Sequence, residues 1–163
     1  MNIQCTANLL KKLKIKPNTN DTNITNIDIK NWHSNILTFG DINTILITND
    51  KTLFSLFIVV QDESEFKFID EIFKESFLKI LFDLGFPQKQ VEIILESLEN
   101  ISYSKTSNRR VTATMNEMKK HIIMNLDREK SVFEINKSLN NDMYSYIEYK
   151  RPINKFKELL EQV

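Results

Sequence analysis

Residues 107–126, SNRRVTATMNEMKKHIIMNL, are the stretch around which we interpret the rest of the chain. Apolar side chains recur in it three or four residues apart, which places them on one side of an α-helix. That set is Val111, Met115, Met118, Ile122 and Leu126. Asn108 can cap the first turn, because its side-chain oxygen can accept from the N–H groups two or three residues on. The segment therefore predicts an amphipathic helix that begins just after Asn108.

Arg109 and Arg110 follow this cap, in the turn where the helix dipole is positive. Exposed cations there typically destabilise a helix by about 0.3–1 kcal/mol each. Arginines beside unpaired backbone N–H groups can also bind phosphate or carboxylate. Two interpretations stay open: the two arginines pair with acidic side chains of this chain, or they bind an external anion.

The composition is that of a folded domain, with 163 residues, 41% hydrophobic and 27% charged. This length is enough to bury a sizeable core, and we predict a single α+β domain over residues 1–163. The net charge of zero provides no overall attraction to nucleic acid or membranes. The charge is uneven, however: residues 61–100 are acidic and residues 101–128 are basic. This favours internal complementarity and leaves a polar surface open to a partner.

Cys5 is the single cysteine, which excludes an internal disulfide and predicts a cytoplasmic location. The first residues, MNIQCTANLLKKLKIK, lack the layout of a secretion signal. The apolar run at residues 53–60 is far shorter than the roughly 20 residues that cross a bilayer, so we expect no membrane partner. Abundant Asn, Ile and Lys with scarce Gly and Pro suggest an AT-rich genome, and hence a bacterium or its phage.

The strand patterns predict a small antiparallel or mixed sheet of four to five strands. The expected strands are residues 2–5, 33–39, 42–48, 52–60 and 100–105. Gly40-Asp41 predicts a hairpin, and residues 49–51 predict the next turn. The near-continuous apolar content of residues 52–60 predicts a central strand that is covered on both faces. Residues 17–31 predict a long loop, with room for a short edge strand at residues 24–29.

Five or six helices are expected to pack against this sheet. Besides residues 107–126 they are residues 6–14, 63–84, 87–98 and 132–139, and a last helix from Pro152. The phenylalanines of residues 63–84 recur at helical spacing and predict core. Gly85 can end that helix in the left-handed conformation. Trp32 predicts a buried anchor; if it were exposed, it would be a candidate for an interface hot spot.

Side chains able to carry catalysis or bind a metal are few. The two histidines, His33 and His121, and Cys5 do not have the spacing of metal ligands, so we expect no metal. The glycines, Gly40 and Gly85, form no phosphate-binding loop, and no nucleophile elbow is present. We expect no cofactor and assign no catalytic residue, and the sequence favours a protein that is not an enzyme.

Several short motifs resemble a bacterial family, the domain-of-unknown-function family 6933. They are Cys5-Thr6 with Leu9, Leu10 and Leu13; Trp32 and the hairpin; Thr48-Asn49 and Thr52 to Ser55; Asn108-Arg109 with Val111; Met115 to Met118; and Tyr149 to Leu160 with Pro152. The family's most specific motif tends to read Asn-Arg-Ser-Val, then Ser-Met-Asn-Asp. This chain departs from it at Arg110, Thr114 and Glu117. The resemblance implies a compact cytoplasmic α+β domain and implies no reaction.

The leading hypothesis is a small, non-enzymatic interaction protein, such as a mobile-element or defence-linked inhibitor or regulator. It would bind a protein or nucleoprotein partner through a basic face at the start of the 107–126 helix. The residues predicted to bind this partner or an anion are Lys105, Asn108, Arg109, Arg110, Asn116, Lys120 and His121.

Two alternatives stay open beside this hypothesis. The same face could bind nucleic acid, in which case affinity would fall steeply with salt. An enzyme could have a pocket between the sheet and the 107–126 helix, where Asn108, Arg109, Asn116 and Glu117 would converge.

Overall fold

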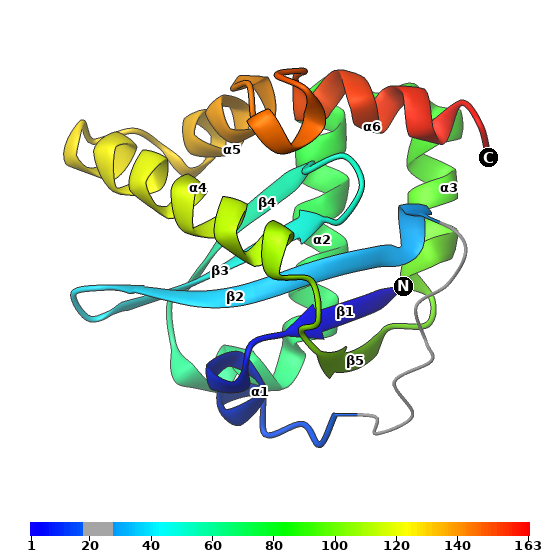
Figure 1. The fold of residues 1–163 in the computed structure, drawn as a ribbon. Helices are drawn as coiled ribbons and strands as arrows, with labels where there is room; N and C mark the ends of the chain where they lie inside the picture. Colours follow the sequence, from blue (N-terminus) through cyan, green and yellow to red (C-terminus); the bar gives the residue numbers. More distant parts are fainter. Residues whose placement is uncertain (18–27) are drawn as a thin grey trace.

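A five-stranded mixed sheet forms the centre of the molecule in the computed structural model, which describes residues 1–17 and 28–163 (Figure 1). Its strands are β1 (Asn2–Cys5), β2 (Asn31–Phe39), β3 (Ile42–Asn49), β4 (Ser55–Val60) and β5 (Ser102–Lys105), in the order β4-β3-β2-β1-β5. β1 runs parallel to both β2 and β5, whereas β2, β3 and β4 are antiparallel. The predicted α+β fold is confirmed, with five strands and a mixed sheet.

Six α-helices flank the sheet in the part of the chain that is described. They are α1 (Ala7–Leu13), α2 (Ile69–Asp83), α3 (Gln88–Leu98), α4 (Arg109–Asp127), α5 (Val132–Asn141) and α6 (Pro152–Leu160). Residues of α1, α2, α3 and α6 share a hydrophobic core on one face, and residues of α4 and α5 share a second core on the other. None of the helices in the described ranges is both long and apolar enough to cross a membrane.

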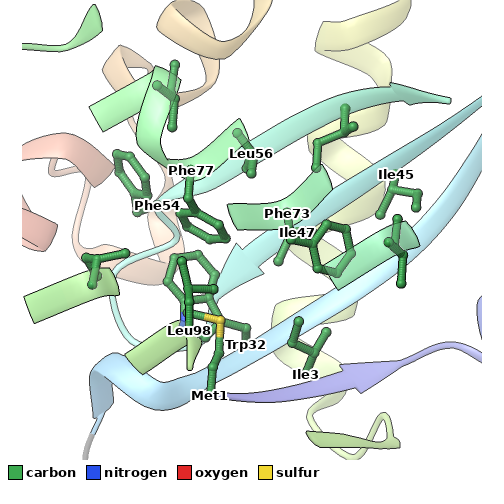
Figure 2. Close-up of a cluster of buried hydrophobic side chains, with 14 of the residues drawn as sticks. Met1, Ile3, Trp32, Ile45, Ile47, Phe54, Leu56, Phe73, Phe77 and Leu98 are labelled. Carbon is green, nitrogen blue, oxygen red and sulfur yellow. The ribbon is translucent and has the colours of Figure 1, made fainter. Parts of the chain in front are cut away.

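Trp32 lies at the centre of the larger core (Figure 2). Its side chain is fully buried, and its ring nitrogen donates a 2.8 Å hydrogen bond to the carbonyl of Ile29. The indole meets Phe77 and Phe156 edge to face, with ring centroids 5.0 and 5.7 Å apart. The prediction of a buried anchor is therefore confirmed. Phe66, Phe73 and Phe77 are core residues as expected. The same prediction is wrong for Phe68 and Phe82, whose side chains are 59% and 62% exposed.

The apolar stripe of α4 forms the second core. Val111, Met115, Met118 and Ile122 are buried against the sheet and against α5. The helix begins at Arg109, and the side chain of Asn108 accepts hydrogen bonds from the N–H groups of Arg110 and Val111. The amphipathic helix predicted from the apolar spacing and the cap predicted at Asn108 are both confirmed.

β4 is not the central strand that its apolar content predicts, because it lies at one edge of the sheet. Its two faces are covered by the two cores, which explains the near-continuous apolar sequence. The strand is also shorter than expected, since Thr52 to Phe54 belong to a turn in which Leu53 has a φ of 60°. The apolar pattern reports burial of the two faces and carries no information about strand order.

The outer edge of β4 is closed by two asparagines of α5. The Asn140 side chain accepts from the N–H of Ser55 and donates to its carbonyl, both at 2.8 Å. Asn136 makes the same pair of hydrogen bonds to Phe57, at 2.7 and 3.0 Å. Both amides are buried, so α5 takes the place of a sixth strand over these residues.

Smaller differences from the expected elements occur at helix boundaries. The segment predicted as one helix over residues 63–84 begins as a 3₁₀ helix, Glu63–Phe68, before α2. Gly85 has the left-handed φ of 70° that was expected at its end. Of the edge strand considered at residues 24–29, residues 24–27 lie outside the described residues, and Asp28–Lys30 forms a 3₁₀ turn.

Asn140→Ala is expected to destabilise the fold, because it leaves the buried N–H and C=O of Ser55 without partners. An unsatisfied buried polar group costs about 1–3 kcal/mol, and two such groups are created. Urea denaturation measures the loss. Asn141→Ala is the matched control, since the hydrogen bond that the Asn141 amide makes in the described part of the chain is to its own helix, at the carbonyl of Lys137. Equal effects of the two substitutions would contradict the role of Asn140 at the strand edge.

Candidate functional site at the start of helix α4

A polar network crosses three strands beneath the start of α4. Gln4 of β1 and His33 of β2 are paired residues on neighbouring strands, and Asp50 directly follows β3. Asp50 accepts from the Gln4 amide at 3.1 Å and lies 2.6 Å from Nδ1 of His33. Gln4 in turn accepts from the Ser107 hydroxyl at 2.7 Å. Three strands and the segment leading into α4 are therefore joined by side-chain hydrogen bonds.

His33 links this network to the backbone of α4. Its ring is 1% exposed, and Nε2 accepts a 3.3 Å hydrogen bond from the N–H of Asn108. An acceptor role for Nε2 places the proton on Nδ1, which then donates to Asp50. Both ring nitrogens are thus engaged inside the fold, which makes His33 a positioning residue and leaves neither nitrogen available to a substrate.

Most of the backbone donors at the start of α4 have partners within the fold. Asn108 provides its N–H to His33, and its side chain accepts from Arg110 and Val111. Of the N–H groups that sequence reasoning offered to an external anion, those of Arg110 and Val111 are therefore occupied by the helix's own cap. An anion at this place would bind mainly to the side chains of Arg109 and Arg110.

Both arginines are exposed, and neither takes part in an ion pair among the described residues. The interpretation that they pair with acidic side chains of this chain is therefore wrong within those residues. The two arginines lie at the positive end of a helix whose start is joined to the sheet by the partly buried polar network. Positive charge in the first turn destabilises a helix. Local features that oppose the fold in this way are typical of functional surfaces.

The structure brings some of the other predicted site residues together and separates the rest. Asn116 and Lys120 are exposed on the same side of α4 as Arg109, because they follow it by seven and eleven residues. His121 lies 3.1 Å from Asp142, so it is engaged within the fold. Lys105 ends β5 in register with Cys5, and strand alternation turns it to the face opposite Ser104.

Asn116 and Glu117 do not converge with Asn108 between α4 and the sheet. Both are exposed, whereas their neighbours Met115 and Met118 are the residues that face the sheet. A groove of about 700 Å³ lies elsewhere, between α2, β4 and α5. The enzyme alternative thus receives no support from the side chains on which it was based.

The His33–Asp50 pair was missed by sequence reasoning, although two signals pointed to it. Polar residues occupy alternate positions along β2, as Asn31, His33 and Asn35, and along β1, as Asn2 and Gln4, although Ser34 adds a polar residue on the other face of β2. Two polar rows on adjacent strands indicate a hydrogen-bonded sheet face. Asn49-Asp50 is also a typical turn sequence, and in the structure the buried Asn49 amide oxygen accepts from Lys51 and Thr52, which fixes the turn that carries Asp50.

Asp50→Ala should destabilise the protein and loosen the start of α4, because His33 and Gln4 lose a shared charged acceptor. Hydrogen bonds to charged groups contribute about 1.5–3 kcal/mol each. Urea denaturation reports the first effect, and faster amide exchange at residues 108–112 reports the second. Asp127→Ala, an exposed carboxylate at the other end of α4, is the control. Unchanged exchange in Asp50→Ala would show that the network does not position α4.

Cys5 is expected to resist modification in the native protein. Its thiol is 1% exposed, and burial raises its pKa to about 12, so it stays protonated at pH 8. Ellman's reagent at pH 8 should release no thiolate until guanidinium chloride is added, after which one equivalent reacts. Rapid native labelling would contradict both the burial and the exclusion of Cys5 as a nucleophile.

Comparison with known proteins identifies a family and no activity. The family model for a domain of unknown function, DUF6933, matches residues 2–155. No curated protein matches the chain, and neither does any solved structure. The family match includes all five strands, the polar network beneath α4 and the arginine pair. Because the match covers nearly all of the sequence, this chain belongs to the DUF6933 family.

Proposed function

We propose that this protein is a non-enzymatic interaction module that binds an acidic surface of a protein or nucleoprotein partner through the start of α4. The observation that carries the proposal is the exposed Arg109–Arg110 pair, which has no ion-pair partner among the described residues. Guanidinium groups form bidentate hydrogen bonds with carboxylates and phosphates, and these bonds add geometric specificity to charge attraction.

The proposed surface continues along α4 from the arginine pair. Arg109, Asn116 and Lys120 lie on one exposed stripe of the helix. Eleven residues at 1.5 Å each give this stripe a length of about 16 Å, which suits a patch of a partner surface. Glu117 lies beside the stripe and reduces its positive charge, so the arginines carry most of the proposed attraction.

The fixed backbone at the start of α4 supports the proposal that this surface binds a partner. The Asn108 cap and the His33 hydrogen bond fix the backbone directly before Arg109. Side chains on a preorganised backbone lose less conformational entropy when they bind, and this raises affinity without additional contacts. The network beneath α4 thus supports binding without contacting the partner.

Nucleic acid is the second candidate partner, and one observation weighs against it. Tyr103 of β5, an aromatic residue close in sequence to the arginine pair, is partly buried and packs against the core on the other side of the sheet. Its hydroxyl donates to Asp70 on α2. Single-stranded nucleic acid is usually held by base stacking on exposed aromatic rings, and Tyr103 does not offer one to the α4 surface.

The proposed setting is the cytoplasm of a bacterium or phage-infected cell, with a role as an inhibitor or regulator linked to a mobile element or to defence. A buried cysteine thiol is suited to a reducing compartment. The AT-rich composition bias is the support for the genomic setting.

Arg109→Glu with Arg110→Glu should abolish partner binding while the protein folds normally, because both side chains are exposed. Tagged wild type and variant are compared by pull-down from host lysate at low and moderate salt, with mass spectrometry and the 260/280 nm ratio of the eluates. A stoichiometric protein that survives moderate salt and is absent with the variant supports the proposal.

The matched control is Lys150→Glu with Arg151→Glu, a second exposed pair of adjacent basic residues at the start of a helix, α6. It should retain the partner. Nucleic acid that elutes only at low salt would favour the second candidate. Loss of the partner in both double variants would assign the effect to net charge and would contradict a site on α4.

A further inference from the structure

A groove of about 700 Å³ runs beside the edge strand β4, between α2 and the start of α5. Its walls carry exposed apolar side chains, with Phe68 59% exposed, Val132 42% exposed and Phe133 39% exposed. Pockets of about 300–1,000 Å³ are the usual size for specific recognition. The groove is on a different part of the molecule from the arginine pair.

The groove begins at the part of β4 whose backbone is not hydrogen-bonded by the asparagine side chains of α5. Asn140 and Asn136 cover Ser55 and Phe57, so each step of four residues along α5 matches a step of two along β4. The two steps are similar in length, about 6.0 Å in a helix and about 6.8 Å in a strand. The next position of this series on α5 is Val132, which is apolar and cannot cap Val59.

Val59 therefore presents to the groove an N–H and a C=O that have no hydrogen-bond partner among the described residues. In the antiparallel ladder with β3 it has the same parity as Ser55 and Phe57, whose polar backbone groups point outward. Val59 and Val132 both line the groove. An exposed strand edge beside apolar walls is suited to an added extended segment, which pairs with the backbone and inserts alternate side chains.

The charge of the groove specifies what that segment must carry. Glu71, Glu75 and Asp83 lie along its α2 side and are exposed, and none is in an ion pair among the described residues. Lys79 is the one cation of the lining, and Glu65, half-buried, adds a fourth carboxylate. Charge complementarity selects a cationic ligand.

We infer that this groove binds an extended peptide segment of a partner protein, in which large apolar side chains alternate with Lys or Arg. The segment pairs its backbone with Val59, packs its apolar side chains against Phe68 and Phe133, and places its cations beside Glu71 and Glu75. This inference is independent of the proposed function of α4, because the two surfaces have opposite charge and share no residue.

The test is a displayed library of random octapeptides selected on the wild-type protein. Selected peptides should be rich in Lys and Arg that flank Leu, Ile, Phe or Trp. Fluorescence anisotropy with the best of them then compares variants. Glu71→Lys with Glu75→Lys should weaken binding at least tenfold, and Phe68→Ser at least fivefold. Val132→Asn should also weaken binding, because it places a third capping amide opposite Val59.

Glu92→Lys with Glu96→Lys on α3 is the matched control and should bind as the wild type does, as should Arg109→Glu with Arg110→Glu. Circular dichroism and urea denaturation show that each variant is folded. The inference is overturned if no peptide is selected, or if the selected peptides lack cationic bias or bind Glu71→Lys with Glu75→Lys unchanged. Sedimentation showing self-association that Arg109→Glu abolishes would also overturn it, since a second copy would then be the occupant.

Discussion

The two hydrogen bonds of His33 are the interaction on which the α4 side of the molecule depends. One ring joins a carboxylate at the end of β3 to the backbone N–H that precedes α4. The ring is buried, so the loss of either partner would leave an unsatisfied polar group away from water. The polar side chains on this sheet face, Gln4, His33 and Asp50, therefore fix where α4 begins. The apolar side chains beneath Met115 and Met118 fix which side of the helix faces the sheet.

The same requirement, that buried backbone groups find partners, shapes the opposite edge of the sheet. Within residues 1–17 and 28–163, β4 has no neighbouring strand on its outer side, and α5 replaces one with the amides of Asn136 and Asn140. A helix can pair with a strand edge in this way only where side chains four residues apart on the helix lie opposite backbone groups two residues apart on the strand. Val132 has no polar side-chain group to bond to the strand, and the groove begins there. The need of backbone groups for hydrogen-bond partners therefore explains both the part of the β4 edge that α5 covers and the part that it leaves uncovered.

What could be predicted from the sequence was what local periodicity encodes. The α4 helix and its Asn108 cap depend on residues within one segment, and the β2–β3 hairpin depends on the Gly40-Asp41 turn. The edge position of β4 could not be predicted, because burial of both faces gives the same apolar pattern at any place in a sheet. His33 and Asp50 are 17 residues apart, and His33 and Asn108 are 75 apart. Such pairings are set by strand order, which periodicity does not report.

At the candidate site, adjacent residues have different roles: Asn108 stabilises the start of α4, and Arg109 and Arg110 expose positive charge. Asn108 uses its backbone and side chain to complete the helix start, while the next two residues place positive charge where the dipole disfavours it. Asp or Glu at those positions would stabilise the helix and reverse the charge of the surface. The Asn108 cap and the hydrogen bond from its N–H to His33 stabilise the helix start at which the arginine charges are unfavourable. That combination is more readily explained by recognition of an anion than by the needs of the fold.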